Sequence, residues 1–157
     1  MSVRTTTLDG NVMNEQITLS YNYALGEVAG KFMQGLREKK ILATRCSKSA
    51  MVYLPPRSFC ERSFERCDSW VEAGSEGVIE ASTVVVRGFE GSRKPPIAIA
   101  FVRLDGVDSA IANYVEELDL SDTEQAMERI KPGTRVKVKF IDAPEGKVTD
   151  FCFVLAG

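Results

Sequence analysis

The order of the β-rich segments in the second half of the chain constrains the fold more than any other feature. Period-two alternation or runs of β-branched residues predict five strands, over residues 76–89, 97–104, 108–118, 134–141 and 147–155. One short helix is predicted before the fourth strand, over residues 121–130, where Ser121 and Glu124 have the spacing of a capping box. This order fits a closed five-stranded OB-fold barrel, and a β-sandwich is the alternative assembly.

The residues before this barrel have a different character. Residues 1–16 are polar and lack periodicity, so we expect a flexible leader or an arm that becomes ordered only on a partner. Apolar side chains at three- and four-residue spacing then predict a helix over about 23–39, which packs on its own domain or docks on a partner. Gly26 and Gly30 in this helix suggest close approach of another backbone. The resulting division is a leader over 1–16, an interaction helix over 17–42, a ribbon-like module over 43–71 and a barrel domain over 72–157.

Composition limits the classes of function. The chain has 157 residues, of which 44% are hydrophobic, enough for one main core with a small appended module. Its formal net charge of -2 lacks the basic excess typical of nucleic-acid binders, so a nucleic-acid partner is not expected. No stretch approaches the roughly 18 apolar residues of a membrane span, and the first residues do not resemble a signal peptide. We therefore expect a soluble, cytoplasmic protein with no membrane partner.

The chain contains no histidine, which removes the commonest general base and the commonest metal ligand. We therefore expect no catalytic residue. A stand-alone enzyme with Cys60 or Cys67 as nucleophile is an alternative, because basic neighbours would favour the thiolate, but the chain supplies no base to activate it.

Residues 45–67, RCSKSAMVYLPPRSFCERSFERC, have the outline of a two-knuckle metal ribbon. Cys46 and Cys60 stand where each knuckle opens, and Ser49 and Ser63 stand where each closes. A serine hydroxyl stays protonated near neutral pH and is a poor zinc ligand. Two alternatives follow: residual zinc held by Cys46, Cys60 and Cys67 with a nearby carboxylate, or a ribbon without firmly bound metal.

Without metal, the ribbon needs an apolar core of its own. The candidates are Met51, Val52, Tyr53, Leu54, Phe59 and Phe64. Docking on a partner would stabilise it further. Cys152, between two phenylalanines, is expected in the core of the last strand rather than at a metal.

Charge is distributed unevenly along the chain. Residues 35–66 hold eight basic side chains against three acidic ones, whereas residues 105–128 hold eight carboxylates and no Lys or Arg. Arginine forks suit phosphate groups, so this basic segment is a candidate phosphate-binding site, and a solvated or protein-contacting face is the alternative. The candidate contacts are Arg45, Lys48, Arg57 and Arg62.

Two loops have further candidate roles. In LDGVDS, Asp105 and Gly106 are expected to form a turn, with Asp108 bonded to a nearby backbone amide, and a partner-facing role is the alternative. In GFEGSRKPP, the loop is long enough to reach outward, and Phe89 and Arg93 are expected to contact a partner.

The order and spacing of several segments together resemble an acyl-CoA-associated family that joins an N-terminal helix and a rubredoxin-like zinc ribbon to an OB-fold barrel. The likeness runs from about residue 21 to the end. It rests on YNYALGEVAGKFMQGLREKKIL, RC, YLPPRSFC, Trp70, EGVIEASTVV, FVRLDGVDSA, IKPGTRVKVKF and VTDFCF. It implies a mainly β chain, with an N-terminal helix and a degenerate zinc ribbon before the barrel. In that family the zinc ligands would fall at positions 46, 49, 60 and 63, where this chain has serine at two.

The resemblance also implies a function. It implies a non-catalytic accessory subunit of a thiolase-like acyltransferase complex, whose catalytic residues lie on a thiolase-superfamily partner, with a second ketosynthase-like subunit as a further partner. Such a subunit supports assembly and the binding of an acyl-CoA or β-ketoacyl substrate. With this resemblance, the phosphates expected at Arg45, Lys48, Arg57 and Arg62 are those of coenzyme A. Phe89 and Arg93 would then contact the partner or the mouth of its acyl tunnel. The alternative is a single-stranded nucleic-acid-binding OB-fold protein, although the barrel segment holds more acidic than basic residues.

Overall fold

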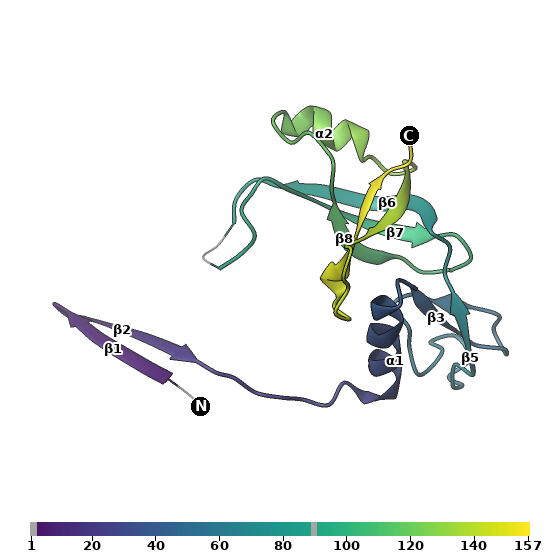
Figure 1. The fold of residues 1–157 in the computed structure, drawn as a ribbon, viewed down its shortest axis with the longest axis horizontal. Coiled ribbons are helices and arrows are strands. Elements are labelled where there is room, and N and C mark those ends of the chain that lie inside the picture. The colour runs from purple at the N-terminus through teal and green to yellow at the C-terminus, as the bar shows by residue number, and fades with distance from the viewer. Residues whose placement is uncertain (1–2, 89–90) are drawn as a thin grey trace.

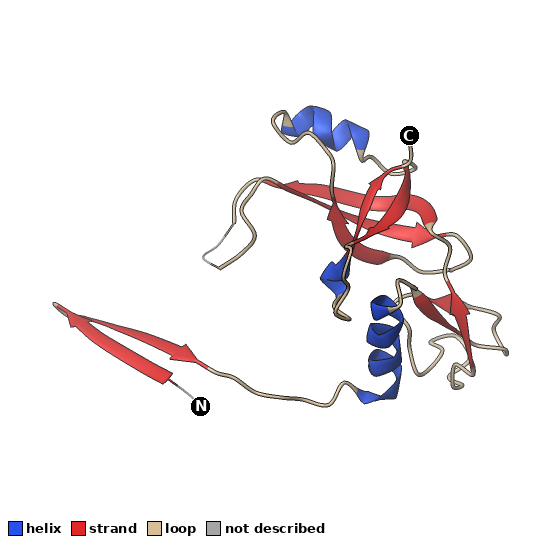
Figure 2. Ribbon diagram, viewed as in Figure 1, coloured by secondary structure: helices blue, strands red, loops and turns tan. Residues whose placement is uncertain are grey.

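The computed structural model describes residues 3–88 and 91–157, and Figures 1 and 2 show its elements. Ten strands, two α-helices and one short 3-10 helix are present in this part of the chain. In chain order they are β1 (Val3–Asp9), β2 (Val12–Thr18), α1 (Gly26–Arg37), β3 (Leu42–Arg45), β4 (Val52–Tyr53), β5 (Ser69–Glu72), β6 (Glu76–Val85), β7 (Ile97–Leu104), β8 (Ile111–Val115), α2 (Thr123–Arg129), β9 (Arg135–Phe140), η1 (Val148–Asp150) and β10 (Phe151–Leu155).

The second half of the chain forms a closed barrel with strand order β10-β8-β7-β6-β9. The pairing of β10 with β8 is parallel and closes the barrel, whereas its pairing with β9 is antiparallel. Gly77 lies where β6 pairs with both β7 and β9, and a Cβ there would meet the backbone oxygen of Arg103 at 2.5 Å. The OB-fold prediction, with its helix before the fourth strand, is confirmed, and the β-sandwich alternative is wrong.

Helix α2 begins one residue later than the capping-box prediction placed it. Its N-cap is Asp122, in extended conformation, whose carboxylate accepts from the backbone N–H groups of Glu124 and Gln125. The Ser121 prediction is wrong because the carboxylate of the next residue, Asp122, accepts from two free N–H groups at once.

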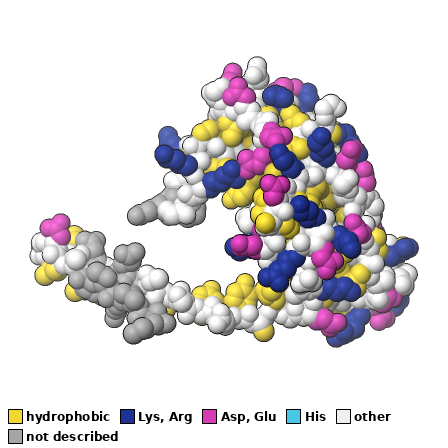
Figure 3. Space-filling view, in the orientation of Figure 1, with side chains coloured by type: hydrophobic (Ala, Val, Ile, Leu, Met, Phe, Trp, Pro, Cys, Tyr) yellow, Lys and Arg dark blue, Asp and Glu magenta, His cyan; other side chains and the backbone are white. Residues whose placement is uncertain are grey.

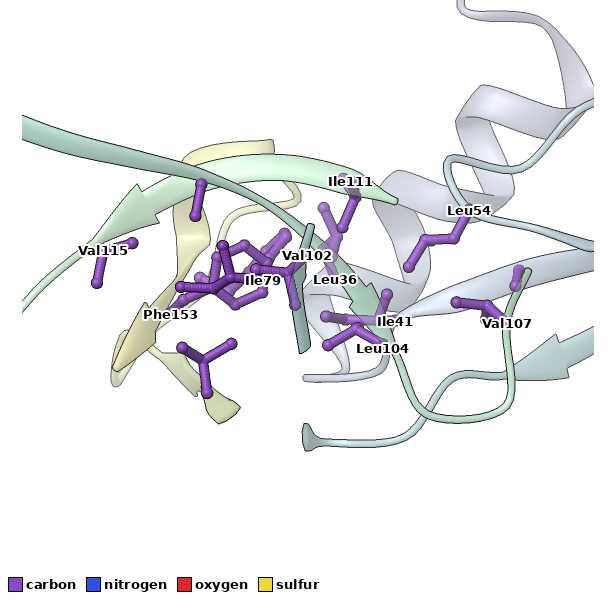
Figure 4. Close-up of a cluster of buried hydrophobic side chains, with 14 of the residues drawn as sticks. Leu36, Ile41, Leu54, Ile79, Val102, Leu104, Val107, Ile111, Val115 and Phe153 are labelled. Carbon is purple, nitrogen blue, oxygen red and sulfur yellow. The ribbon is translucent and has the colours of Figure 1, made fainter. Parts of the chain in front are cut away.

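One core joins the helix, the ribbon and the barrel. Figure 4 shows Leu36 of α1 and Leu54 of the ribbon pointing towards the same cluster as Ile79 and Val102 of the barrel. Leu36, Leu54 and Val102 are fully buried. The predicted parts therefore share a hydrophobic interior, although the chain order suggests separate modules.

Helix α1 packs on its own domain through Phe32, Gly35 and Leu36. The expected close approach at Gly26 and Gly30 is not found, since a Cβ at either position would meet nothing within 4 Å. The tight position is Gly35, where a Cβ would lie 2.8 Å from the side chain of Leu42. With 12 residues, α1 is the longest helix among the described residues. No helix in this part of the chain has the length and the apolar character needed to span a membrane.

Residues 3–18 form a regular two-stranded hairpin, where the sequence predicts a leader without periodicity. The two-residue loop at 10 and 11 explains the difference, because Gly10 adopts a φ of 57° that a tight hairpin turn favours. Figure 1 shows this hairpin projecting away from the rest of the molecule. Residues 18–27, which connect it to α1, are all exposed.

Candidate functional site

The two knuckles of the ribbon, residues 46–49 and 60–63, lie against each other, and the cysteine of each contacts the serine of the other. Cys46 Sγ of the first knuckle lies 3.3 Å from Ser63 Oγ of the second, and Ser49 Oγ lies 3.1 Å from Cys60 Sγ. Both sulfurs are buried, with 1% exposure of each cysteine. The sequence spacing therefore brings together the four positions that a two-knuckle metal ribbon would use.

Tyr53 of β4 adds a fifth group to this cluster. Its hydroxyl lies 3.2 Å from Cys60 Sγ, and the residue is 1% exposed. Burial raises the pKa of Cys60, but hydrogen bonds from Ser49, Ser63 and Tyr53 outweigh burial and lower the pKa to about 5. The hydrogen bond to Cys60, together with burial, raises the pKa of Tyr53 to about 12.

Cys67 packs against the cluster but is not hydrogen-bonded to its four knuckle side chains in any described contact. Burial raises the pKa of the Cys67 thiol, which disfavours the thiolate that a metal needs. Among residues 3–88 and 91–157, no group of three or more His, Cys, Asp or Glu side chains could hold a metal ion. Two thiols and two hydroxyls do not fit tetrahedral zinc, which favours four deprotonated ligands.

The predicted apolar core of the ribbon is only partly present. Val52, Tyr53 and Leu54 are buried, as expected. Phe59 and Phe64 instead point outward, with exposures of 54% and 84%, because the hydrogen-bonded cluster occupies the space between the knuckles.

The four predicted phosphate contacts lie on and beside the knuckles, and all four residues are exposed. Lys48 pairs with Glu65, and Arg57 pairs with Glu61 while its guanidinium lies 5.1 Å from the Tyr53 ring. Arg45 and Arg62 have no carboxylate partner within the described residues. Consistent with these pairings, Figure 3 shows basic and acidic side chains interleaved on the face in view.

A second candidate surface is a groove of about 520 Å³ on the barrel, between the loop that follows β6 and the loop that follows β9. Its lining residues are Arg93, Tyr114, Glu116, Ile141, Thr149, Phe151 and Cys152. The Arg93 guanidinium lies 4.7 Å from the Tyr114 ring and 2.6 Å from a carboxylate oxygen of Glu116. The hydrogen bond that Arg93 donates to Glu116 raises the pKa of Arg93.

Sequence reasoning named Arg93 for an outward role but missed Tyr114 and Glu116. Strand alternation places Tyr114 on the opposite face from the buried Ile111, Asn113 and Val115, and this pattern was visible in the sequence. Phe89 lies outside the described residues.

Cys152 is half-buried and faces this groove, so its assignment to the core is wrong. Successive strand residues point to opposite faces, and the neighbours Phe151 and Phe153 take the core side. Its thiol contacts the backbone oxygen of Lys139 at 3.6 Å, and burial raises its pKa.

The LDGVDS segment fastens the ribbon to the barrel. Asp108 accepts a hydrogen bond from the Val52 N–H at 2.8 Å and returns one from its own N–H to the Val52 carbonyl at 2.9 Å. The expectation of a backbone bond at Asp108 is confirmed. Nearby, Arg135 binds both carboxylate oxygens of Asp105, which lowers the Asp105 pKa.

Comparison with known proteins agrees with the barrel. A family model described as the C-terminal OB-fold domain of ChsH2 matches residues 70–140. These residues resemble the C-terminal OB-fold domain of ChsH2. No protein with a curated description matches the chain.

Two solved structures extend the likeness beyond the ChsH2-like domain. A chain of an Ltp2-ChsH2(DUF35) aldolase has 16% identity and a TM-score of 0.67, with 87% of this chain and 100% of that chain covered. A DUF35-family protein of unknown function from Sulfolobus solfataricus has 22% identity and a TM-score of 0.60, over 83% of this chain and 86% of that one. At these identities the likeness establishes the fold alone.

Proposed function

We propose that this chain is a non-catalytic accessory subunit of a thiolase-like acyltransferase complex, which supports assembly and the binding of an acyl-CoA or β-ketoacyl substrate. The observation that carries the proposal is its fold likeness to a whole chain of an Ltp2-ChsH2(DUF35) aldolase. The family-model match over the barrel supports the same assignment.

The chemistry of the side chains favours an active centre on the partner over one on this chain. The chain has no histidine, so any thiol nucleophile would lack the commonest activating base. Cys46 and Cys60 are buried and engaged by hydroxyl groups, which leaves them inaccessible to a thioester.

The N-terminal segment supports a partner-binding role. A single two-stranded hairpin is at best marginally stable in water, so the hairpin of residues 3–18 gains from a surface that covers it. The segment also exposes many large apolar side chains: Leu8, Val12, Met13, Leu19, Tyr21, Tyr23 and Leu25. We assign this arm to contact with the catalytic subunit.

The basic residues of the ribbon suit the phosphate groups of coenzyme A. Arg45 and Arg62 are exposed and not neutralised by a carboxylate in the described chain, so a phosphate would meet them without breaking an ion pair. Lys48 and Arg57 would leave their exposed ion pairs with Glu65 and Glu61 to contact phosphate. Exposed ion pairs contribute little to stability, so this change costs little.

The experiment is co-purification of the chain with a thiolase-like subunit, followed by measurement of coenzyme A binding to the complex. Arg45→Gln with Arg62→Gln should weaken coenzyme A binding by about thirtyfold, since each of the two lost phosphate contacts costs roughly 1 kcal/mol. Arg129→Gln, an exposed arginine on α2, is the matched control and should change nothing.

Two outcomes would reject the proposal. One is the failure of any thiolase-like subunit to bind the chain. The other is tight binding of a short single-stranded oligonucleotide at physiological salt, which would favour the nucleic-acid alternative. Unchanged coenzyme A binding in an intact complex would remove only the phosphate role of the two arginines.

A further inference from the structure

We infer that the ribbon of this chain is metal-independent: a hydrogen-bonded cluster of Cys46, Ser49, Tyr53, Cys60 and Ser63 holds the two knuckles together in place of a zinc ion. This inference concerns how the ribbon is built and does not depend on the proposed function.

The two knuckles have equivalent backbone shapes. In each, the opening cysteine donates its N–H to a carbonyl five residues later, Cys46 to Met51 and Cys60 to Glu65, both at 2.9 Å. The residue after each closing serine has a left-handed conformation, with φ of 62° at Ala50 and 56° at Phe64. The chain therefore keeps the loop geometry of a two-knuckle ribbon at positions where the closing ligands are serines.

The spacing between the knuckle side chains is that of hydrogen bonds. The two oxygen–sulfur distances across the knuckles are 3.1 and 3.3 Å. In a tetrahedral zinc site with Zn–S near 2.3 Å and Zn–O near 2.0 Å, the same edge would be about 3.5 Å. Each sulfur contacts one serine oxygen of the opposite knuckle directly, so an ion between the knuckles would have to lengthen both distances.

Each serine hydroxyl already makes two hydrogen bonds. Ser49 Oγ accepts from the Met51 N–H at 3.3 Å, and Ser63 Oγ accepts from the Glu65 N–H at 3.4 Å. Each hydroxyl also shares a hydrogen bond with a sulfur of the opposite knuckle, in which either atom can donate. Coordination of zinc would require these oxygens to turn from the sulfurs and share their lone pairs with the metal.

Tyr53 completes the cluster. Its buried hydroxyl lies 3.2 Å from Cys60 Sγ and gives this sulfur a second hydroxyl contact beside that of Ser49. An ion missing from a built site leaves buried polar atoms unpaired, but every buried side-chain nitrogen and oxygen in the described chain has a partner. The hydrogen-bond requirements of the ribbon are met by its own side chains.

The test measures bound metal in the full chain, purified in reducing buffer from cells grown with added zinc. We expect well below about 0.1 equivalents of zinc or any other thiophilic metal, and a melting temperature unchanged by a strong chelator. Ser49→Ala with Ser63→Ala, and separately Tyr53→Phe, should lower the melting temperature equally with and without chelator. A wild-type protein with about one metal ion per chain, or one that unfolds in chelator, would overturn the inference.

A variant designed to gain zinc binding gives an independent test. Ser49→Cys with Ser63→Cys restores four thiols on an unchanged backbone, so this variant should bind about one zinc ion and acquire a chelator-sensitive melting temperature. Ser47→Cys with Ser58→Cys adds two thiols at exposed positions outside the cluster and should bind none. Equal zinc binding by both variants would contradict the assigned geometry; if the first variant does not fold, the wild-type measurement still decides.

Discussion

Replacing Asp150 with asparagine should destabilise the protein more than any other single loss of charge on the barrel. Asp150 is 3% exposed, and one of its carboxylate oxygens accepts from three backbone N–H groups, those of Glu145, Gly146 and Lys147, at 2.6–2.8 Å. This arrangement shapes the loop that contacts α1, since Arg37 donates to the Glu145 carbonyl at 2.7 Å.

The magnitude follows from the number and kind of these bonds. A hydrogen bond to a charged group contributes about 1.5–3 kcal/mol, and three bonds to one oxygen are not additive, so we expect a loss of about 2–4 kcal/mol for Asp150→Asn. For a chain of this size that loss lowers the melting temperature by about 5–15 °C. Urea denaturation at pH 7, followed by circular dichroism, measures the loss directly.

The effect should also depend on pH. Burial raises the pKa of Asp150, but the hydrogen bonds from the N–H groups of Lys147, Gly146 and Glu145 outweigh burial and lower it. Because the pKa is lower in the folded state, the carboxylate stabilises the protein fully above the unfolded value of about 3.9 and loses this effect as pH falls below it. The stability gap between wild type and Asp150→Asn should therefore be full at pH 7 and shrink below about pH 4.

Asp142→Asn is the matched control, because Asp142 lies in the same loop but is exposed and has no hydrogen bond or ion pair within the described residues. It should change stability by less than about 0.5 kcal/mol. Equal urea midpoints for the two variants at pH 7 would refute the role assigned to the buried carboxylate.

Three further predictions follow from the packing. Asp108→Ala removes the charged acceptor of the Val52 N–H and should lower the free energy of unfolding by about 1–3 kcal/mol, with faster amide hydrogen exchange in the ribbon than in the barrel. Equal exchange rates in both would contradict the role of Asp108 in holding the ribbon to the barrel. In urea denaturation, Gly30→Ala should raise the free energy of unfolding by up to about 1 kcal/mol, since its Cβ would meet nothing within 4 Å, whereas Gly35→Ala should lower it by about 1–3 kcal/mol because its Cβ would lie 2.8 Å from the Leu42 side chain. The same sign for both changes would be inconsistent with the packing of α1. Deleting residues 3–18 should leave the melting temperature within about 2 °C but weaken the complex with the catalytic subunit in a pull-down, and unchanged binding would exclude the arm as a contact.

The barrel was predictable because its information is local. Strand alternation and a short helix before the fourth strand are periodic features, and β6, β7 and β9 follow them. These features depend on residues that are neighbours in the chain. The bond at Asp108 was predictable in kind, because a short acidic side chain after a turn commonly binds a backbone amide, but its partner Val52 lies in a distant segment and required the fold.

The details that failed depend on contacts between distant segments. Cys152 looked like a core residue because its neighbours are aromatic, but only the register of β10 shows which face it takes. Phe59 and Phe64 face outward because the space inside the ribbon is filled by hydrogen-bonded serine and cysteine side chains. The spacing of the knuckles predicted where these side chains meet, but the contribution of Tyr53 required the fold.

The central claim is that this chain supports the chemistry of a partner and performs none itself. The decisive measurement is the steady-state turnover of an acyl-CoA or β-ketoacyl-CoA thioester by this chain alone, by the thiolase-like subunit alone, and by the two together. We predict no turnover by this chain, and a kcat/KM for the pair at least about tenfold above that of the catalytic subunit alone. Turnover by the isolated chain, or an identical kcat/KM with and without it, would contradict the claim.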